Sequence, residues 1–124
     1  MATLKTDGLE TVAIRMISST RAAFTYGALS SNATAESTAG TTLTGEIATA
    51  GLQRAAMTCT NPSTYVFQMA YVWTSTQTVE IMKVAFFNDS TAGNMLGEHL
   101  FSVAKGLISG ETLTITAQGS IQAA

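Results

Sequence analysis

Charged side chains are scarce in this sequence. Asp, Glu, Lys and Arg make up 11% of the 124 residues, whereas about 25% is typical of soluble domains. The six basic residues are scattered singly and the net charge is −2, so we expect no basic stripe and no nucleic-acid partner. Because interface cores are depleted in charge, the composition favours a chain whose surface largely faces other protein. A monomer with a Thr-rich surface is the alternative.

Cysteine and histidine each occur once, which limits the available chemistry. With Cys59 alone, no internal disulfide and no thiolate metal cluster can form, and we expect Cys59 to be a small buried hydrophobe. His99 follows Glu98 directly, and neighbours on a strand point to opposite faces. Glu98 therefore cannot orient His99 as a general base, and a surface or interface histidine is the favoured interpretation.

The acidic residues show no metal-binding or catalytic spacing such as HExxH or the acidic calcium loop. Two carboxylates could still meet in space as a glycosidase-like pair, but nothing in the sequence favours it. We predict no catalytic residue, no metal site, no cofactor and no enzymatic activity. The eight carboxylates are Asp7, Glu10, Glu36, Glu46, Glu80, Asp89, Glu98 and Glu111.

Long hydrophobic runs are absent as well. The longest apolar stretches have the length of a strand, far below the roughly 20 residues that span a bilayer. Residues 1–5 do not begin an apolar signal segment. We therefore expect no membrane partner and synthesis in a cytoplasm.

Only one segment has the pattern of a helix. Residues 7–18 carry a potential capping pair, Asp7 and Glu10, ahead of apolar residues at helical spacing. Residues 30–42 consist mostly of Ser, Thr, Ala, Asn and Gly, and such a segment buries too little apolar surface to order itself. We expect residues 30–42 to form a flexible interaction loop that becomes ordered in an assembly.

The remaining chain predicts strand after strand. Short alternating segments are separated by turn residues every 8 to 15 positions, which favours a single antiparallel β-sandwich or barrel-like domain over residues 1–124. In the strongest segment, 64–74, all the odd positions from Tyr65 to Trp73 carry large side chains, and we expect them to face the core. A turn is expected at 60–63, around the only proline. The predicted strands cover residues 23–29, 51–59, 64–74, 79–87, 95–103 and 112–118.

Five segments share a pattern with known proteins: Ala23–Leu29, Thr42–Ile47, Gly51–Ala56, Phe86–Leu96 and Ser109–Thr116. Together they resemble a family of small virion proteins of tailed bacteriophages, whose members are commonly labelled tail-fibre or structural proteins. The fourth segment is similar to the family's turn of phenylalanine-asparagine, small residues, glycine and methionine-leucine, and the fifth is similar to its closing strand. The resemblance covers nearly the whole chain.

The resemblance implies a non-enzymatic structural role in the virion. A fibre shaft needs heptads or shaft repeats, which this chain lacks, whereas a compact β module of low charge suits a small symmetric oligomer on a lattice. We therefore expect a capsid decoration, or cement, protein that forms a homotrimer or another small oligomer and contacts the major capsid protein or tail proteins. The alternative is a tail- or fibre-associated module that binds a receptor or glycan through residues 30–42 and exposed aromatic side chains.

Overall fold

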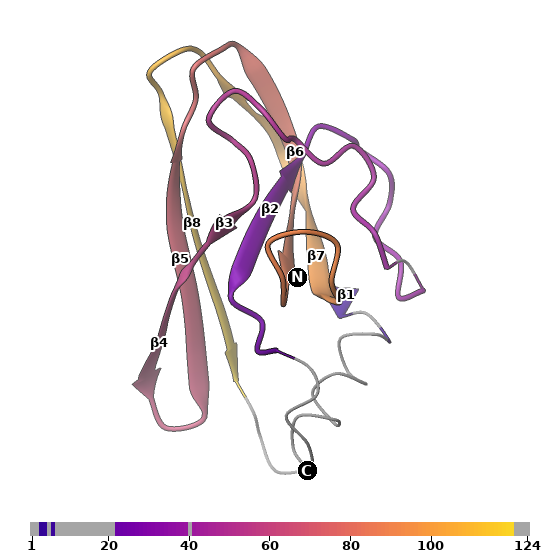
Figure 1. The fold of residues 1–124 in the computed structure, drawn as a ribbon, viewed down its shortest axis with the longest axis vertical. Coiled ribbons are helices and arrows are strands. Elements are labelled where there is room, and N and C mark those ends of the chain that lie inside the picture. Colours follow the sequence, from indigo (N-terminus) through magenta and orange to yellow (C-terminus); the bar gives the residue numbers. More distant parts are fainter. Residues whose placement is uncertain (1–2, 5, 7–21, 40, 121–124) are drawn as a thin grey trace.

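The chain folds as two antiparallel β-sheets packed face to face in a computed structural model that describes residues 3–4, 6, 22–39 and 41–120 (Figure 1). This confirms the predicted mainly β, sandwich-like fold. The expected helix at 7–18 lies outside the described residues. The strands are β1 Thr3–Leu4, β2 Tyr26–Ser30, β3 Ala55–Ala56, β4 Thr58–Ser63, β5 Val66–Thr74, β6 Val79–Phe87, β7 Met95–Leu107 and β8 Thr112–Ser120.

The chain passes from one sheet to the other several times. The larger sheet, sheet A, has the order β1-β7-β6-β2-β3, and the smaller one, sheet B, has the order β4-β5-β8. The segment after β3 carries the chain to β4, so the two sheets are joined along that side. On the opposite side, β7 of sheet A and β8 of sheet B are connected only by the short turn at 108–111. The sandwich is therefore continuous along one side and open along the β7/β8 side.

The main core lies between the sheets and is centred on Trp73. This side chain is 1% exposed, and its indole Nε1–H donates to the Gln53 carbonyl oxygen at 3.0 Å. The hydrogen bond satisfies the one polar group of the side chain, which would otherwise be buried without a partner. Both sheets and the loop before β3 contribute to this core. Its buried members are Leu29, Leu52, Met57, Met69, Trp73, Ile81, Val84, Phe86 and Leu107.

A second, smaller core lies on the other face of sheet A. Alternation along β2 and β6 places Ala28, Ala85 and Phe87 on this face, opposite to the main core. Leu43, from the loop between β2 and β3, is buried against them together with Met95. This loop returns to β2 through the Ile47 N–H, which donates to the Leu29 carbonyl at 2.8 Å, and an isolated bridge joins Ser30 to Glu46. Part of the loop after β2 therefore covers sheet A.

Several predicted boundaries are wrong around the β4–β5 hairpin. The expected strand at 51–59 is limited to β3 and the start of β4, and the expected turn at 60–63 belongs to β4. The turn is instead at Thr64–Tyr65, where Tyr65 has a φ of 65°. Pro62 is tolerated inside a strand because β4 lies at the edge of sheet B, where a missing N–H breaks no necessary ladder bond.

The expectation that the large side chains at odd positions from Tyr65 to Trp73 face the core is only half correct. Met69 and Trp73 are buried and Tyr71 is partly buried, but Tyr65 is 73% exposed and Phe67 is 42% exposed. Figure 1 shows the reason: the turn end of the β4–β5 hairpin extends beyond the nearby strands of sheet A. Among the described residues, no strand of sheet A lies opposite the core-facing positions there. The other predicted strands match β2, β6, β7 and β8 apart from shifts at their ends.

No helix in the described part of the chain has the length and apolar character needed to cross a membrane.

Candidate interaction surface

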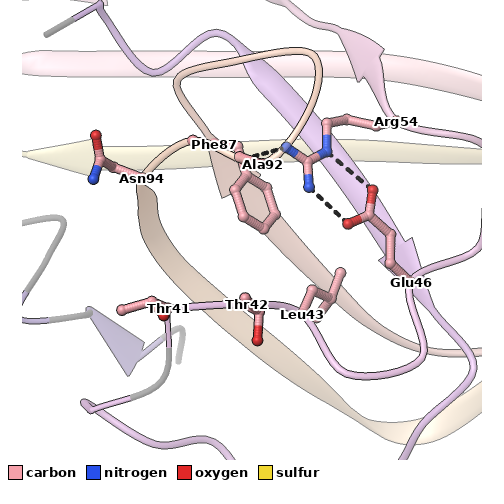
Figure 2. A pocket seen from close by; sticks show the side chains of 9 residues that line it. Thr41, Thr42, Leu43, Glu46, Arg54, Phe87, Ala92 and Asn94 are labelled. Carbon is pink, nitrogen blue, oxygen red and sulfur yellow. Dashed lines mark hydrogen bonds and ion pairs between the residues drawn. The ribbon is translucent and has the colours of Figure 1, made fainter.

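A cavity of about 330 Å³ lies beside the loop that covers sheet A. Figure 2 shows Arg54 reaching across one side of it toward Glu46, with Phe87 beneath the guanidinium and Thr41, Thr42 and Leu43 along the opposite wall. The guanidinium carbon is 3.7 Å from the centroid of the Phe87 ring. An arginine beside a cavity could bind an anion, so its hydrogen-bond partners decide its role.

The Arg54 guanidinium is almost fully committed to protein partners. Its Nε donates to Glu46 Oε2 at 3.0 Å and its Nη2 to Glu46 Oε1 at 2.6 Å. Its Nη1 donates to the carbonyl oxygens of Asp89 and Ala92, at 3.0 and 2.7 Å. Four of the five N–H donors of an arginine are thereby used. Arg54 joins the loop before β3 to the turn between β6 and β7, and this is a structural arrangement.

The candidate catalytic residues of β7 are separated as the sequence predicts. Glu98 points to the outer side of sheet A, where it is buried and lies 4.0 Å from the Lys83 ammonium. His99 points to the opposite face, toward Phe101, with ring centroids 5.6 Å apart. The sequence did not reveal the partner that His99 does have: its Nδ1 lies 3.7 Å from Glu36 Oε1. That partner lies 63 positions away in the chain, and no local pattern signals it.

The loop containing Glu36 also reaches the backbone of β7. Glu36 Oε1 accepts the Leu100 N–H at 2.7 Å, and the Ser37 N–H donates to Glu98 Oε1 at 3.2 Å. Glu36 therefore caps an N–H at the edge of sheet A. Residues 30–42 were expected to contact a neighbouring subunit; within one chain, their described part contacts β7.

The other carboxylates are dispersed. Glu46 is paired with Arg54, Asp89 lies in the turn after β6, Glu80 is exposed on β6, and Glu111 Oε1 accepts the Ile108 N–H at 3.2 Å. Asp7 and Glu10 lie outside the described residues. Within residues 3–4, 6, 22–39 and 41–120, no group of three His, Cys, Asp or Glu side chains could hold a metal ion.

Sheet B contains no charged residue. Neither β4, β5 nor β8 includes an Asp, Glu, Lys, Arg or His. Its outer face is formed by alternate residues of the three strands, including Val72, which is 52% exposed, and the Gln68–Gln118 pair, in which Gln118 Nε2 donates to Gln68 Oε1 at 2.6 Å. The described charged residues all lie in sheet A and in the loops. One face of the sandwich is therefore both exposed and uncharged.

A groove of about 320 Å³ follows the open side of the sandwich. Val84, Phe86, His99 and Phe101 form its wall on sheet A, and residues 114–118 of β8 form its wall on sheet B. It is therefore continuous with the uncharged strand β8. The exposed apolar side chain of Val103, 68% exposed, lies on the same strand as His99 and Phe101.

The exposed aromatic side chains gather at the end of the β4–β5 hairpin. Tyr65 occupies the turn, and the Phe67 ring lies against Gly119 of the neighbouring strand β8, where a Cβ on residue 119 would lie 2.5 Å from Phe67 Cε1. An aromatic ring over a glycine of an edge strand shields the backbone there. Among the described residues, Tyr65 and Phe67 at this hairpin end are therefore exposed aromatic rings that could stack against a ligand.

Part of this surface could have been identified from the sequence. No charged residue occurs between Arg54 and Glu80, or after Glu111. The overall scarcity of charge in the sequence suggests an interface. Only the strand order shows that the charge-free segments 55–79 and 112–120 contribute the three strands of one sheet.

Comparison with models of known protein families finds none that matches this chain, and comparison with curated proteins finds no match either.

Proposed function

We propose that this chain is a non-enzymatic structural protein of a tailed-virus particle, most consistent with a capsid decoration protein that binds copies of itself and neighbouring shell subunits. The observation that carries the proposal is the uncharged sheet B, with an exposed face of Thr, Val, Ala, Gln and Ser side chains. The resemblance of five segments to small phage virion proteins is the reason for assigning the chain to a virus particle. Its place would be in the virion, after synthesis in the host cytoplasm.

The physical basis is the cost of desolvation. Removing a charged side chain from water on binding costs several kcal/mol unless it is paired well, whereas small uncharged side chains can be buried with modest penalties. A sheet face without charges can therefore be covered by a neighbouring subunit over its whole width. Binding to the folded shell then stabilises that shell by mass action.

Particles assembled with and without the protein provide the test. Particles that lack it should release their genome at a lower temperature, and addition of the purified chain should restore resistance. The Val72→Lys variant, which places a charge at the centre of the uncharged face, should fail to restore it. Thr91→Lys adds the same charge in the exposed β6–β7 turn and should restore resistance as the unsubstituted chain does. Equal heat resistance of particles with and without the protein would overturn the proposal.

The second candidate function is glycan or receptor binding by a tail-associated module. The observation that favours it is the exposure of Tyr65 and Phe67 at the hairpin end, because exposed aromatic faces are available for stacking on sugar rings. Glycan-array binding that is lost in the Tyr65→Ala variant and kept in Val72→Lys would support this function over shell binding. Absence of signal from every glycan and from host cells would exclude it.

A further inference from the structure

In the described part of the chain, strand β8 has one edge that is free along its whole length. It pairs with β5 through all nine of its residues, from Thr112 opposite Thr74 to Ser120 opposite Val66. Among the described residues, no strand lies along its other side. Residues 112, 114, 116, 118 and 120 are all exposed. A long free edge presents unpaired N–H and C=O groups that another strand can bind.

The other sheet edges carry features that discourage strand addition. On β4, the edge opposite β8, Pro62 removes an N–H and the register shifts between Thr60 and Ser63. At the β7 edge of sheet A, Glu36 caps the Leu100 N–H, and Lys105 lies further along the strand. The outermost strands of sheet A, β1 and β3, have two residues each. Proline, irregular register, charge and shortness are the devices that protect edges, and β8 has none of them.

The hydrogen bonds at the start of β8 indicate which of its backbone groups point outward. The Ser75 N–H donates to the Glu111 carbonyl at 2.8 Å, and the Ser75 carbonyl accepts the Gly110 N–H at 2.7 Å, so the Glu111 carbonyl points toward Ser75, the residue that follows β5. Backbone groups point alternately to the two sides of a strand, and the register from Thr112 to Ser120 is unbroken, so the odd-numbered residues of β8 direct their N–H and C=O groups to β5. The even-numbered residues, from Thr112 to Ser120, direct theirs to the free edge.

We propose that a second copy of this chain pairs with β8 in antiparallel orientation, with a two-fold axis at Thr116, so that the two B sheets form one continuous six-stranded sheet. The inference rests on the proposed function and specifies one mode of the self-association that it includes. In this register Thr116 faces the partner's Thr116, Thr114 faces the partner's Gln118, and Thr112 faces the partner's Ser120.

This register is selected by length and by side-chain chemistry. A centre at Thr116 pairs all nine residues of β8, whereas a centre at Ile115 leaves residues 119–120 of each copy unpaired and a centre at Ala117 leaves residues 112–113 unpaired. No like charges meet in the pair, because β8 is uncharged, and Thr–Thr pairs across strands are favourable. On the inner face, Ile115 faces the partner's Ala117. The partner strand therefore also adds apolar surface at the mouth of the groove that His99 and Phe101 line. This contact enlarges the interface, because the pairing of two strands alone buries little surface.

Cysteine cross-linking tests the register directly, in a Cys59→Ser background that removes the only native thiol. Hydrogen-bonded antiparallel pairs have Cα atoms about 5.5 Å apart, a separation that a disulfide spans. Under mild oxidation, Thr116→Cys should give a covalent dimer. Thr114→Cys alone should remain monomeric on denaturing gels, but an equimolar mixture of Thr114→Cys and Gln118→Cys should give a mixed dimer. Cross-linking of Thr114→Cys with itself, or none with Thr116→Cys, would overturn this register.

Sedimentation of the variants without oxidation provides the second test. The unsubstituted chain should sediment as a dimer, and so should the matched control Thr91→Lys. Thr116→Lys should be monomeric because it places two ammonium groups opposite each other at the two-fold axis, while its circular dichroism should stay that of the folded chain. Dimers of Thr116→Lys as stable as those of the unsubstituted chain would contradict β8 pairing.

The two proposals fail in different ways. If the unsubstituted chain is monomeric at all concentrations but still protects particles from heat, the β8 pairing is wrong and the particle function stands. If Thr116→Cys forms the dimer and neither this dimer nor the unsubstituted chain protects particles, the pairing stands and the proposed function is wrong.

Discussion

The Arg54 guanidinium forms a two-point ion pair with the Glu46 carboxylate, with Nε 3.0 Å from Oε2 and Nη2 2.6 Å from Oε1. The Arg54 side chain is 8% exposed and that of Glu46 27%. Because Arg54 also holds two carbonyl oxygens of the β6–β7 turn, it connects two loops and stacks on Phe87. Arg54 therefore links the loop before β3 to the β6–β7 turn.

Replacement of Arg54 should destabilise the fold strongly. Arg54→Ala leaves the Glu46 carboxylate and two carbonyls without their donor, and removing one partner of a largely buried pair costs about 3–5 kcal/mol. Arg54→Lys should lose less but still measurably, because an ammonium cannot reproduce the planar fork. Urea denaturation followed by circular dichroism measures both. Lys105→Ala, at an exposed position of β7, is the control and should change the unfolding free energy by less than about 0.5 kcal/mol. Equal stability of Arg54→Ala and the unsubstituted chain would show that the two loops do not need this residue.

Gly51 should tolerate no side chain. Its φ is +74°, and a Cβ at this position would overlap the Thr74 carbonyl oxygen, a backbone atom that cannot move aside without shifting the strand. We expect Gly51→Ala to lower the free energy of unfolding by at least about 2 kcal/mol, through strain at a left-handed backbone and through the clash. Thermal unfolding gives the value.

Gly106 provides the matched control for this glycine. A Cβ there would meet no atom within 4 Å, so Gly106→Ala should be neutral or slightly stabilising because it restricts the unfolded chain. Similar losses for the two alanine variants would mean that the close approach of Gly51 to Thr74 is not required for folding.

The sandwich could be predicted because its strands carry the period-2 pattern of half-buried sheets. In β8, Leu113, Ile115 and Ala117 alternate with threonine and glutamine, and they pack against the main core as that pattern requires. The connection between the predicted strands 79–87 and 95–103 coincides with the β6–β7 turn, where Asn88, Asp89 and Gly93 have strong turn chemistry. In these segments local pattern and tertiary environment agree.

The failures occur where tertiary context overrides a local signal. Pro62 predicts a turn, but an edge strand tolerates it, and the turn moves to Thr64–Tyr65. Phe67 has the parity of a core residue but lies beyond the opposing sheet and packs against Gly119 instead. The free edge of β8 could not be predicted, because strand order depends on contacts between segments far apart in the chain.

Trp73 should report on the main core. It is the only tryptophan and is 1% exposed, so the native emission spectrum should be blue-shifted and should move to longer wavelength on unfolding. Trp73→Phe removes the donor to the Gln53 carbonyl and leaves a cavity, for a combined cost of about 2 kcal/mol. Unfolding followed by circular dichroism measures this loss. Tyr65→Phe removes a polar group from an aromatic residue in the exposed hairpin turn and should be neutral. A Trp73→Phe variant as stable as Tyr65→Phe would contradict the packing described for the main core.

Cys59 should react as an exposed thiol, contrary to the sequence-based expectation of burial. It lies opposite Met69 on the inward side of β4, yet it is exposed, because β4 is the outermost strand of sheet B and sheet A ends on that side with the two-residue β3. An aromatic disulfide reagent should therefore modify one thiol per chain in the native protein at a rate close to that in urea. Cys59→Ser should give no reaction. Modification only after unfolding would mean that β4 is covered along its inward side and that the sandwich closes further there than its strand order indicates.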